Sequence, residues 1–203
     1  MILPKAWVRE RQKDYFYRRA KGERLRSRAA YKLLEVVATY NLIKLGDVVV
    51  DLGAAPGGWM QIALRAVDGK GFVLGVDLRE IRPLEAGNAR SIAADITEPQ
   101  IIEAVTDFLP RAPEVVISDV SPNISGVWEL DQARQIDLAR RSLLIAASLL
   151  KPGGNFFVKV FQGDLLEHFV SDVRRQFRFV RLIKPKASRK SSSELFVLGL
   201  NKI

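Results

Sequence analysis

Runs of consecutive apolar residues alternate along the chain with stretches in which apolar positions recur every three or four residues. The first pattern is typical of strands covered on both faces of a sheet, and the second of amphipathic helices. Strands are predicted at 48–52, 72–77, 90–94, 114–119, 155–160, 177–183 and 194–201. Helices are predicted at 27–40, 58–66, 100–109, 130–150 and 165–176.

This alternation predicts a doubly wound α/β fold with right-handed crossovers and a mostly parallel sheet of seven strands, with helices on both faces. The last two strands are joined by a polar loop, "KPKASRKSSS", with no helix between them. They are therefore expected to pair as a hairpin, which makes the last strand antiparallel. The length of 203 residues suits one domain with a sizeable core.

A glycine-rich turn, "DLGAAPGGW", follows the first predicted strand. Gly53, Gly57 and Gly58 allow sharp bending and close approach to a ligand, and Pro56 stiffens the loop. The order of glycines departs from the G-x-G-x-x-G fingerprint of dinucleotide sites, and no Gly-Lys-Ser/Thr follows as in a Walker loop. The turn therefore favours a ligand that lacks a pyrophosphate.

Three acids stand at the carboxyl ends of later predicted strands, where ligands bind in such sheets: Asp77, Asp95 and Asp119. Asp77 is placed to accept hydrogen bonds from both hydroxyls of a ribose, and Asp95 from an adenine amino group. An adenosine with a cationic tail fits this arrangement, and S-adenosylmethionine is such a molecule. Ordinary strand-end acids are the alternative.

The net charge of +9 is concentrated at the N-terminus, since residues 1–32 alone carry +8. A second basic stretch spans 174–190 and contains no acid. Two basic segments indicate a nucleic-acid surface, and Tyr15, Phe16, Tyr17 and Tyr31 among the N-terminal charges could stack on bases. We therefore expect a basic RNA-binding N-terminal extension at 1–26 and a single catalytic domain at 27–203, although a merely solvated basic tail gives the same pattern.

Composition excludes several kinds of chemistry. The chain has no cysteine and one histidine, which excludes thiolate metal sites, a cysteine nucleophile and a histidine-built zinc site. No metal is expected. No apolar run approaches the ~20 residues of a membrane helix, and the N-terminus lacks a signal-peptide pattern. A cytoplasmic protein without a membrane partner is expected.

Four blocks in order carry a resemblance to a known family: "DLGAAPGGW", "SDVSPNISG", "LKPGGNFFVKVF" and "KPKASRKSSSELF". From about Arg26 to the end, the chain resembles the FtsJ/RrmJ-like (RlmE) family of ribose 2'-O-methyltransferases of large-subunit ribosomal RNA. The resemblance implies a Rossmann-like class I S-adenosylmethionine-dependent methyltransferase fold. It also implies a uridine of 23S-type RNA as the target.

The resemblance places the family's catalytic set on Lys32, Asp119, Lys159 and Glu194, with Lys159 as proton acceptor. It places the cofactor contacts on Gly57, Trp59, Asp77, Asp95 and Asp119. Lys159 is independently unusual, because it interrupts the apolar run "FFVKVF" and an unpaired buried ammonium is costly. An outward-facing or snorkelling lysine is the alternative.

The protonation state of Lys159 stays open at this point. Burial and the neighbouring Lys32 favour a neutral amine that serves as a base, whereas Asp119 and Glu194 favour an ammonium that stabilises a developing alkoxide. The substrate is also open between ribosomal RNA and tRNA, and a non-catalytic RNA-binding protein with a relict cofactor pocket is a further alternative. A monomer acting on a 50S-type particle is the expected assembly.

Overall fold

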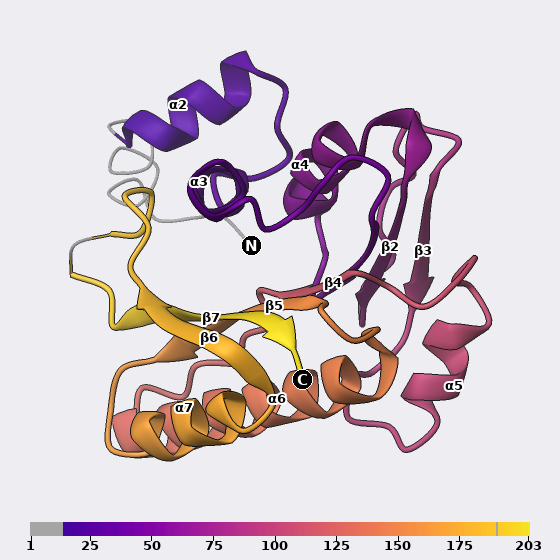
Figure 1. Ribbon diagram of the computed structural model, residues 1–203. Coiled ribbons are helices and arrows are strands. Elements are labelled where there is room, and N and C mark those ends of the chain that lie inside the picture. The colour runs from indigo at the N-terminus through magenta and orange to yellow at the C-terminus, as the bar shows by residue number, and fades with distance from the viewer. Residues whose placement is uncertain (1–13, 190) are drawn as a thin grey trace.

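One sheet of seven strands forms the centre of the protein, as the computed structural model of residues 14–189 and 191–203 shows (Figure 1). The order across the sheet is β3-β2-β1-β4-β5-β7-β6. The strands are β1 Val48–Leu52, β2 Phe72–Asp77, β3 Ala89–Ala93, β4 Val115–Ser118, β5 Asn155–Phe161, β6 Phe177–Ile183 and β7 Glu194–Lys202. All seven coincide with the predicted strands to within two residues at either end.

Strands β1 to β5 pair in parallel, and β7 runs antiparallel to both of its neighbours. The prediction of an antiparallel last strand is confirmed. The antiparallel strand is not at the edge of the sheet, however. β7 lies between β5 and β6, so β6 is the edge strand. This insertion places the start of β7 beside the end of β5.

Helices cover both faces of the sheet (Figure 1). On one face lie α2 Tyr15–Gly22, α3 Ala30–Tyr40 and α4 Gly58–Val67, which is followed by the short 3-10 turn η1 Asp68–Lys70. On the other lie α5 Ile101–Thr106, α6 Trp128–Leu149 and α7 Leu166–Arg174. In the part of the chain that the structure describes, no helix is long and apolar enough to cross a membrane.

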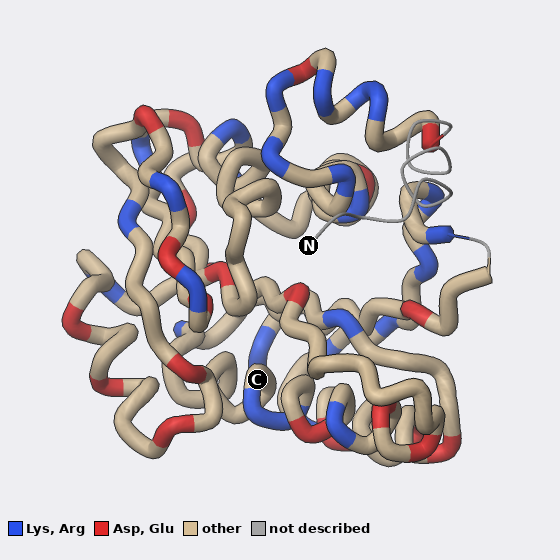
Figure 2. Tube along the Cα trace, turned by 180° about the vertical axis from the view of Figure 1, so that it is seen from behind, with Lys and Arg blue, Asp and Glu red and all other residues tan. Residues whose placement is uncertain are grey.

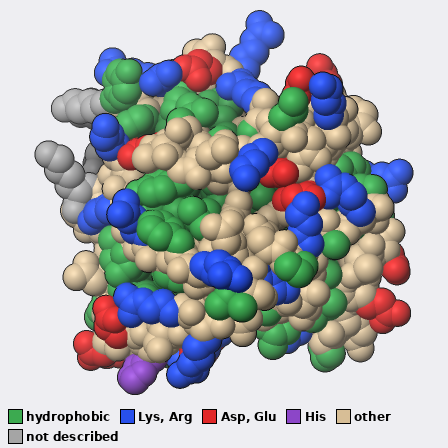
Figure 3. Space-filling view, in the orientation of Figure 1, with side chains coloured by type: hydrophobic (Ala, Val, Ile, Leu, Met, Phe, Trp, Pro, Cys, Tyr) green, Lys and Arg blue, Asp and Glu red, His purple; other side chains and the backbone are tan. Residues whose placement is uncertain are grey.

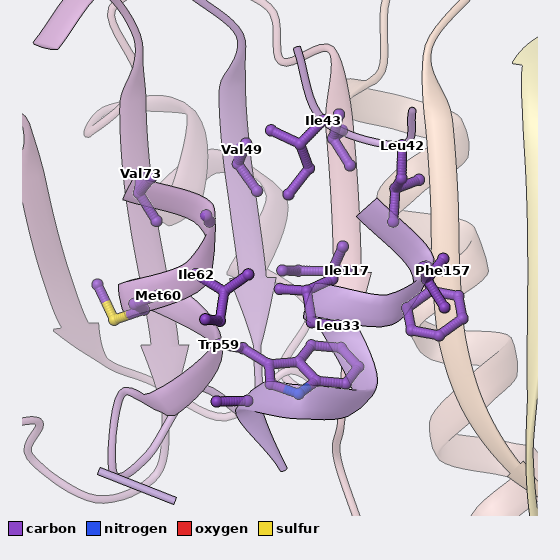
Figure 4. Packing of buried hydrophobic residues seen from close by; sticks show 14 of the residues in the cluster. Leu33, Leu42, Ile43, Val49, Trp59, Met60, Ile62, Val73, Ile117 and Phe157 are labelled. Carbon is purple, nitrogen blue, oxygen red and sulfur yellow. The ribbon is translucent and has the colours of Figure 1, made fainter. Parts of the chain in front are cut away.

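Alternate residues of each central strand enter two separate cores. Val49 packs under α3 and α4, whereas Val50 packs toward α5 to α7. The first core is drawn in Figure 4, where the indole of Trp59 lies beside Leu33 and Phe157. Trp59 stacks on Phe157 with ring centroids 5.6 Å apart. Burial of each such large side chain stabilises the fold by roughly 1.5–3 kcal/mol.

Helix α2 was not predicted, because its single apolar side is hidden among charges. Asp14 caps the helix by accepting a hydrogen bond from the N–H of Tyr17 (3.1 Å). Ala20 is buried, and the ring of Phe16 packs on Tyr31 of α3 at 5.5 Å. Part of the expected N-terminal extension is therefore folded against the domain. Residues 1–13 of it lie outside the described residues.

Strand β1 lies between β2 and β4, so the winding of the sheet reverses beside it. Ligands in open α/β sheets bind in the crevice at such a switch point, outside the carboxyl ends of the strands. The glycine-rich turn after β1 leads into α4 at this point. The fold therefore places a ligand site where the sequence expected one.

Candidate active site

A cleft of about 570 Å³ opens at the carboxyl ends of β1, β2, β3 and β4. Three of the predicted cofactor residues line it: Asp77, Asp95 and Asp119. The remaining lining residues are Gly53, Ala55, Leu78, Arg79, Ala94, Ile96, Thr97, Val120, Ser121, Pro122, Asn123 and Leu138. The cleft thus combines apolar walls with a few carboxylates, as small-molecule sites do.

Two glycines of the turn are required by close contacts. Gly53 has a φ of 75°, and a Cβ there would lie 2.7 Å from the side chain of Val120 and 2.8 Å from its backbone nitrogen. Gly57 has a φ of 101°, and a Cβ there would lie 2.8 Å from the guanidinium of Arg26. Left-handed backbone favours glycine at both positions. The turn is therefore held tightly against β4 and against the residues before α3.

The carboxylates of Asp77 and Asp95 are oriented by neighbouring N–H groups. Asp77 accepts from the N–H of Ala55 (2.9 Å) through one oxygen and from the N–H of Arg79 (2.9 Å) through the other. Asp95 accepts from the N–H and the hydroxyl of Thr97 through Oδ1 alone, and these bonds lower the pKa of its carboxyl. Both acids keep acceptor capacity toward the cleft, which fits ribose hydroxyls and an adenine amino group.

A fourth carboxyl, Asp51, is fully buried near the end of β1 and was not predicted as a site residue. Neither of its oxygens has a hydrogen-bond partner among the described residues; the N–H of Met60 lies near without completing one. Burial, followed by the nearby Asp119 and Asp77 carboxylates, raises the pKa of Asp51 well above its usual range. Four carboxyl groups thus lie in or beside one cleft, which favours a ligand that carries positive charge.

Lys159 extends from β5 toward Asp119, the residue after β4. Its Nζ donates a hydrogen bond to the backbone carbonyl of Asp119 (2.8 Å) and lies 3.2 Å from Oδ1 of the same residue. That second approach lacks hydrogen-bond geometry, so buried Oδ1 keeps a free acceptor position. The lysine is 6% exposed and is not the outward-facing lysine of the alternative reading.

The other two members of the predicted catalytic set form a second pair. Nζ of Lys32, on α3, lies 2.7 Å from each carboxylate oxygen of Glu194 at the start of β7. The hydroxyl of Ser188 donates to the same carboxylate (2.8 Å). Only about a tenth of each charged side chain of the pair is exposed. The pair is therefore a fixed element of the site.

Strand register places the two pairs next to one another. Lys159 lies opposite Phe196 in the β5–β7 ladder, and Phe161 lies opposite Glu194. Lys159 and Glu194 are thus diagonal neighbours on one face of the sheet, at a separation of roughly 7–8 Å between Cα atoms. The structure brings Lys32, Asp119, Lys159 and Glu194 to one corner, adjoining the cleft through Asp119.

Gly57 and Trp59 do not line the cleft. The side chain of Trp59 is 3% exposed, and its indole N–H donates to the carbonyl of Ala29 (2.8 Å) inside the first core. The N–H of Gly57, the cap residue before α4, donates to the carbonyl of Ala54 (2.6 Å), whereas Trp59 is in the first turn of α4, where N–H groups have no partner within the helix. A cofactor contact from Trp59 would therefore come from its backbone.

Sequence reasoning also missed Gln135 and Ser188. Gln135 is fully buried on α6 and donates to the carbonyls of Val120 (3.2 Å) and Lys159 (3.0 Å). It thereby ties the two strand ends that carry Asp119 and Lys159. No local sequence pattern indicates that a helical glutamine will have such contacts. Ser188, in contrast, lies within "KPKASRKSSSELF", one of the four blocks that carry the family resemblance.

The sheet order, the single antiparallel strand and the acid-lined cleft at the switch point define a class I methyltransferase that uses S-adenosylmethionine. A family model described as FtsJ-like methyltransferase matches residues 25–202. The chain belongs to the FtsJ-like methyltransferase family.

Relatives with known names are similar over nearly the whole chain. Two are named ribosomal RNA large subunit methyltransferase E. The protein from Methanococcus maripaludis is 48% identical over 96% of this chain and 76% of its own. The protein from Archaeoglobus fulgidus is 49% identical over 95% and 97%. A crystal structure of a ribosomal RNA methyltransferase from Plasmodium falciparum superposes with a TM-score of 0.76 at 22% identity, over 87% of this chain and 98% of that chain, and supports the fold.

Proposed function

We propose that this protein transfers the methyl group of S-adenosylmethionine to the 2'-hydroxyl of a ribose in large-subunit ribosomal RNA, with a uridine as the target. The observation that best supports this reaction is the position of Asp119, which both lines the cofactor cleft and contacts Lys159. The cofactor side and the proton-accepting side of a transfer therefore meet at one residue. The relatives named as ribosomal RNA large subunit methyltransferases support the substrate.

In this proposal Lys159 accepts the proton of the 2'-hydroxyl. S-adenosylmethionine, when bound, supplies an electrophilic methyl group on a sulfonium. The backbone carbonyl of Asp119 accepts a hydrogen bond from Nζ of Lys159, and Oδ1 of Asp119 lies 3.2 Å from the same nitrogen, so the amine is positioned to accept the proton that the 2'-hydroxyl loses. A positioned base contributes about 10²–10⁴-fold to such a transfer. Lys32 and Glu194, as a buried pair, hold their own charges fixed beside that amine.

Transfer of a tritiated methyl group to total RNA, followed by mapping of 2'-O-methyl sites, tests this function. RNA from cells that lack the protein is the substrate, and RNA from wild-type cells is the matched control because its site is already modified. We expect label at one ribose of large-subunit RNA. Label in tRNA, or on a base, would contradict the proposal, and absence of any label would support the non-catalytic alternative.

RNA is proposed to reach the site over the two basic segments. Their described parts lie on either side of α3, with blue Lys and Arg positions along α2 and along the loop before β7 in Figure 2. The loop is held against α3 and the turn before it, because Arg28 of that turn donates to the carbonyl of Ala187 and Glu35 of α3 accepts from the N–H of Lys186 (2.8 Å). Segments distant in sequence thus form one basic surface beside the catalytic corner.

Apolar and aromatic groups accompany this charge. Figure 3 shows hydrophobic side chains filling the space between α3 and the β6–β7 pair, with Lys and Arg side chains around them. The guanidinium of Arg181 lies 5.4 Å from the ring of Phe179 and 5.8 Å from the ring of Tyr40. Guanidinium and aromatic groups together suit single-stranded RNA, since bases stack on both.

The salt dependence of RNA binding tests this surface. Arg18→Gln with Lys21→Gln removes two exposed charges of α2 and leaves buried Ala20 in place. We expect the slope of log affinity against log salt to fall by about 1 to 2 units, with unchanged affinity for S-adenosylmethionine. Lys44→Gln with Lys70→Gln is the matched control, because these exposed lysines precede β1 and β2, at the ends of the strands opposite to the cleft. Equal slopes for both variants would show that the charges of α2 are only solvated and do not contact RNA.

The remaining parts of the proposal concern assembly and place. The protein is proposed to act as a cytoplasmic monomer on a 50S-type particle, and not through a membrane. Assay of naked ribosomal RNA against purified 50S subunits from cells lacking the protein distinguishes the particle from the free RNA. Faster turnover on subunits is the expected result. Sedimentation of the pure protein at working concentration tests the monomer.

A further inference from the structure

Exposed apolar side chains occur in the segment that leads into α6, and one of them stacks on a ring at the end of β5, beyond Lys159. We call them, together with that ring, the apolar shelf: Ile124, Val127, Trp128, Leu130 and Phe161. Four of the five come from one short segment, 124–130, and are between 42% and 64% exposed. Large apolar side chains exposed together mark interaction sites. The reaction as described leaves this shelf without a role.

The centre of the shelf is a stacked pair of rings. The indole of Trp128, the first residue of α6, lies parallel to the ring of Phe161 within 24°, with centroids 6.0 Å apart. Trp128 is 44% exposed, so a large part of its surface is open to solvent. Two aligned and partly exposed aromatic rings are the arrangement on which unpaired bases stack.

The shelf continues directly from the catalytic corner. Phe161 is two residues after Lys159 on β5, so both side chains project from the same face of the strand, roughly 6.6 Å apart along it. Phe161 also lies opposite Glu194 in the ladder. A ribose held at Lys159 therefore places the base of an adjoining nucleotide within reach of the rings.

A buried anchor keeps the shelf in shape. The carboxylate of Asp131 is 3% exposed and accepts hydrogen bonds from the N–H (2.8 Å) and hydroxyl (2.8 Å) of Ser125 and from the N–H of Gly126 (3.0 Å). These bonds lower the pKa of Asp131, so the anchor stays charged. The segment that carries the exposed side chains is thus fastened from beneath, as a binding surface requires.

The geometry points to a nucleobase subsite: the shelf stacks one base of single-stranded RNA, that of a nucleotide adjoining the methylated ribose. The inference rests on the proposed function, because it takes Lys159 as the position of the reacting ribose. Stacking is tolerant of base identity. The subsite therefore holds the strand and sets the position of the ribose without reading the sequence.

Trp128→Ala tests the subsite, with Trp128→Phe as the conservative variant. We expect Trp128→Ala to raise KM for ribosomal RNA by about tenfold to a hundredfold, the range of one lost base–aromatic stack, while Trp128→Phe recovers most of it. Affinity for S-adenosylmethionine and thermal stability stay unchanged in both. Phe108→Ala is the matched control, because Phe108 is similarly exposed (40%) but follows α5, away from the catalytic corner.

Photocrosslinking separates this inference from the proposed function. RNA that carries 5-iodouridine is bound to the wild-type protein without cofactor, and the crosslinked peptide is identified by mass spectrometry. A crosslink to Trp128 or Phe161 supports the subsite even if methyl transfer is absent. A crosslink confined to other residues, together with unchanged KM in Trp128→Ala, overturns it.

The third outcome concerns a protein partner. If Trp128→Ala is silent on naked RNA and slows only the reaction on intact 50S subunits, the shelf contacts a ribosomal protein. The nucleobase subsite is then wrong, although the methyltransferase function stands.

Discussion

The cofactor cleft and the catalytic corner adjoin at Asp119 but are built in different ways. The acids of the cleft each follow or end one parallel strand, so Asp77, Asp95 and Asp119 meet because carboxyl ends of neighbouring strands share an edge. The catalytic corner joins segments distant in sequence, since Lys32 and Glu194 are 162 residues apart. The cofactor cleft follows from strand order alone. The catalytic corner requires α3, β5, β7 and the loop before β7 to be packed correctly.

This contrast predicts different responses to substitution. A change at Asp77 or Asp95 should weaken cofactor binding and leave the corner intact, because each of these two carboxylates is oriented by its own neighbouring N–H groups. A change in the corner should lower turnover and leave cofactor affinity intact. Changes in the Lys32–Glu194 pair should also affect stability, since that pair connects α3 to the sheet.

The largest effect is expected from Lys159. Lys159→Met keeps most of the buried volume and removes the amine, and kcat should fall about 10²–10⁴-fold, the contribution of a positioned base. Lys159→Arg keeps the charge without an available base and should be as inactive. Single-turnover methyl transfer gives kcat, and calorimetry checks that both variants bind S-adenosylmethionine as the wild type does.

The two variants also distinguish the roles that sequence reasoning left open. Substantial turnover by Lys159→Arg would assign an electrostatic role to this position and remove Lys159 as the proton acceptor. Wild-type rates in Lys159→Met would place the chemistry elsewhere.

In the cleft, Asp77→Asn should weaken affinity for S-adenosylmethionine by about tenfold to a hundredfold, as expected when hydrogen bonds to a charged acceptor are lost. Turnover at saturating cofactor should remain near that of the wild type. Glu80→Gln, an exposed acid three residues later, is the matched control. A fall in kcat with unchanged cofactor affinity would contradict the division between cleft and corner.

The sequence predicted the cleft better than the corner, and the reason is the range of the contacts. Apolar runs located all seven strands, and an acid at the end of a strand is a local pattern that survives folding. That Lys32 and Glu194 belong to one site was implied only by the family resemblance, because no local pattern joins a helix near the N-terminus to a strand near the C-terminus. The insertion of β7 between β5 and β6, which makes their pairing possible, was not predicted.

Other misses have the same origin or a simpler one. Helix α2 was missed because only Ala20 and the partly buried Phe16 form its apolar side. Most of the surrounding residues are charged, so the sequence shows no helical apolar pattern. The contacts of Gln135 with two strand ends depend on how α6 crosses the sheet. The burial of Trp59 in the first core could not be separated from a cofactor contact by sequence alone.

The Lys32–Glu194 pair should show intermediate effects. Glu194→Gln leaves the ammonium of Lys32 buried without a charged partner, and such losses typically cost about 3–5 kcal/mol of stability. Lys32→Met together with Glu194→Gln should cost less than the two single changes added, with a coupling of roughly 1–3 kcal/mol. Urea unfolding of the wild type, both single variants and the double variant measures it; additivity would show that the pair is not coupled.

The smallest effect belongs to Asp51, and it concerns pH. Because burial raises the pKa of this carboxyl, the folded protein holds a proton that the unfolded chain has already lost above its ordinary pKa of about 3.9. Stability therefore falls as pH rises between that value and the raised folded pKa, by up to about 1.4 kcal/mol per pH unit from this group. The loss is absent below the unfolded-state pKa and complete above the folded one.

Asp51→Asn should remove this dependence and raise the free energy of unfolding at pH 7 by an amount on the order of 1 kcal/mol, since the amide is neutral but has its own unpaired polar atoms. Unfolding in urea across pH 4 to 8 compares the two proteins. Equal slopes would mean that Asp51 is ionised and paired in solution. A steeper loss in the wild type that disappears with saturating S-adenosylmethionine would show that the positive charge of the cofactor, and not a protein cation, compensates the buried carboxyl beneath the cleft.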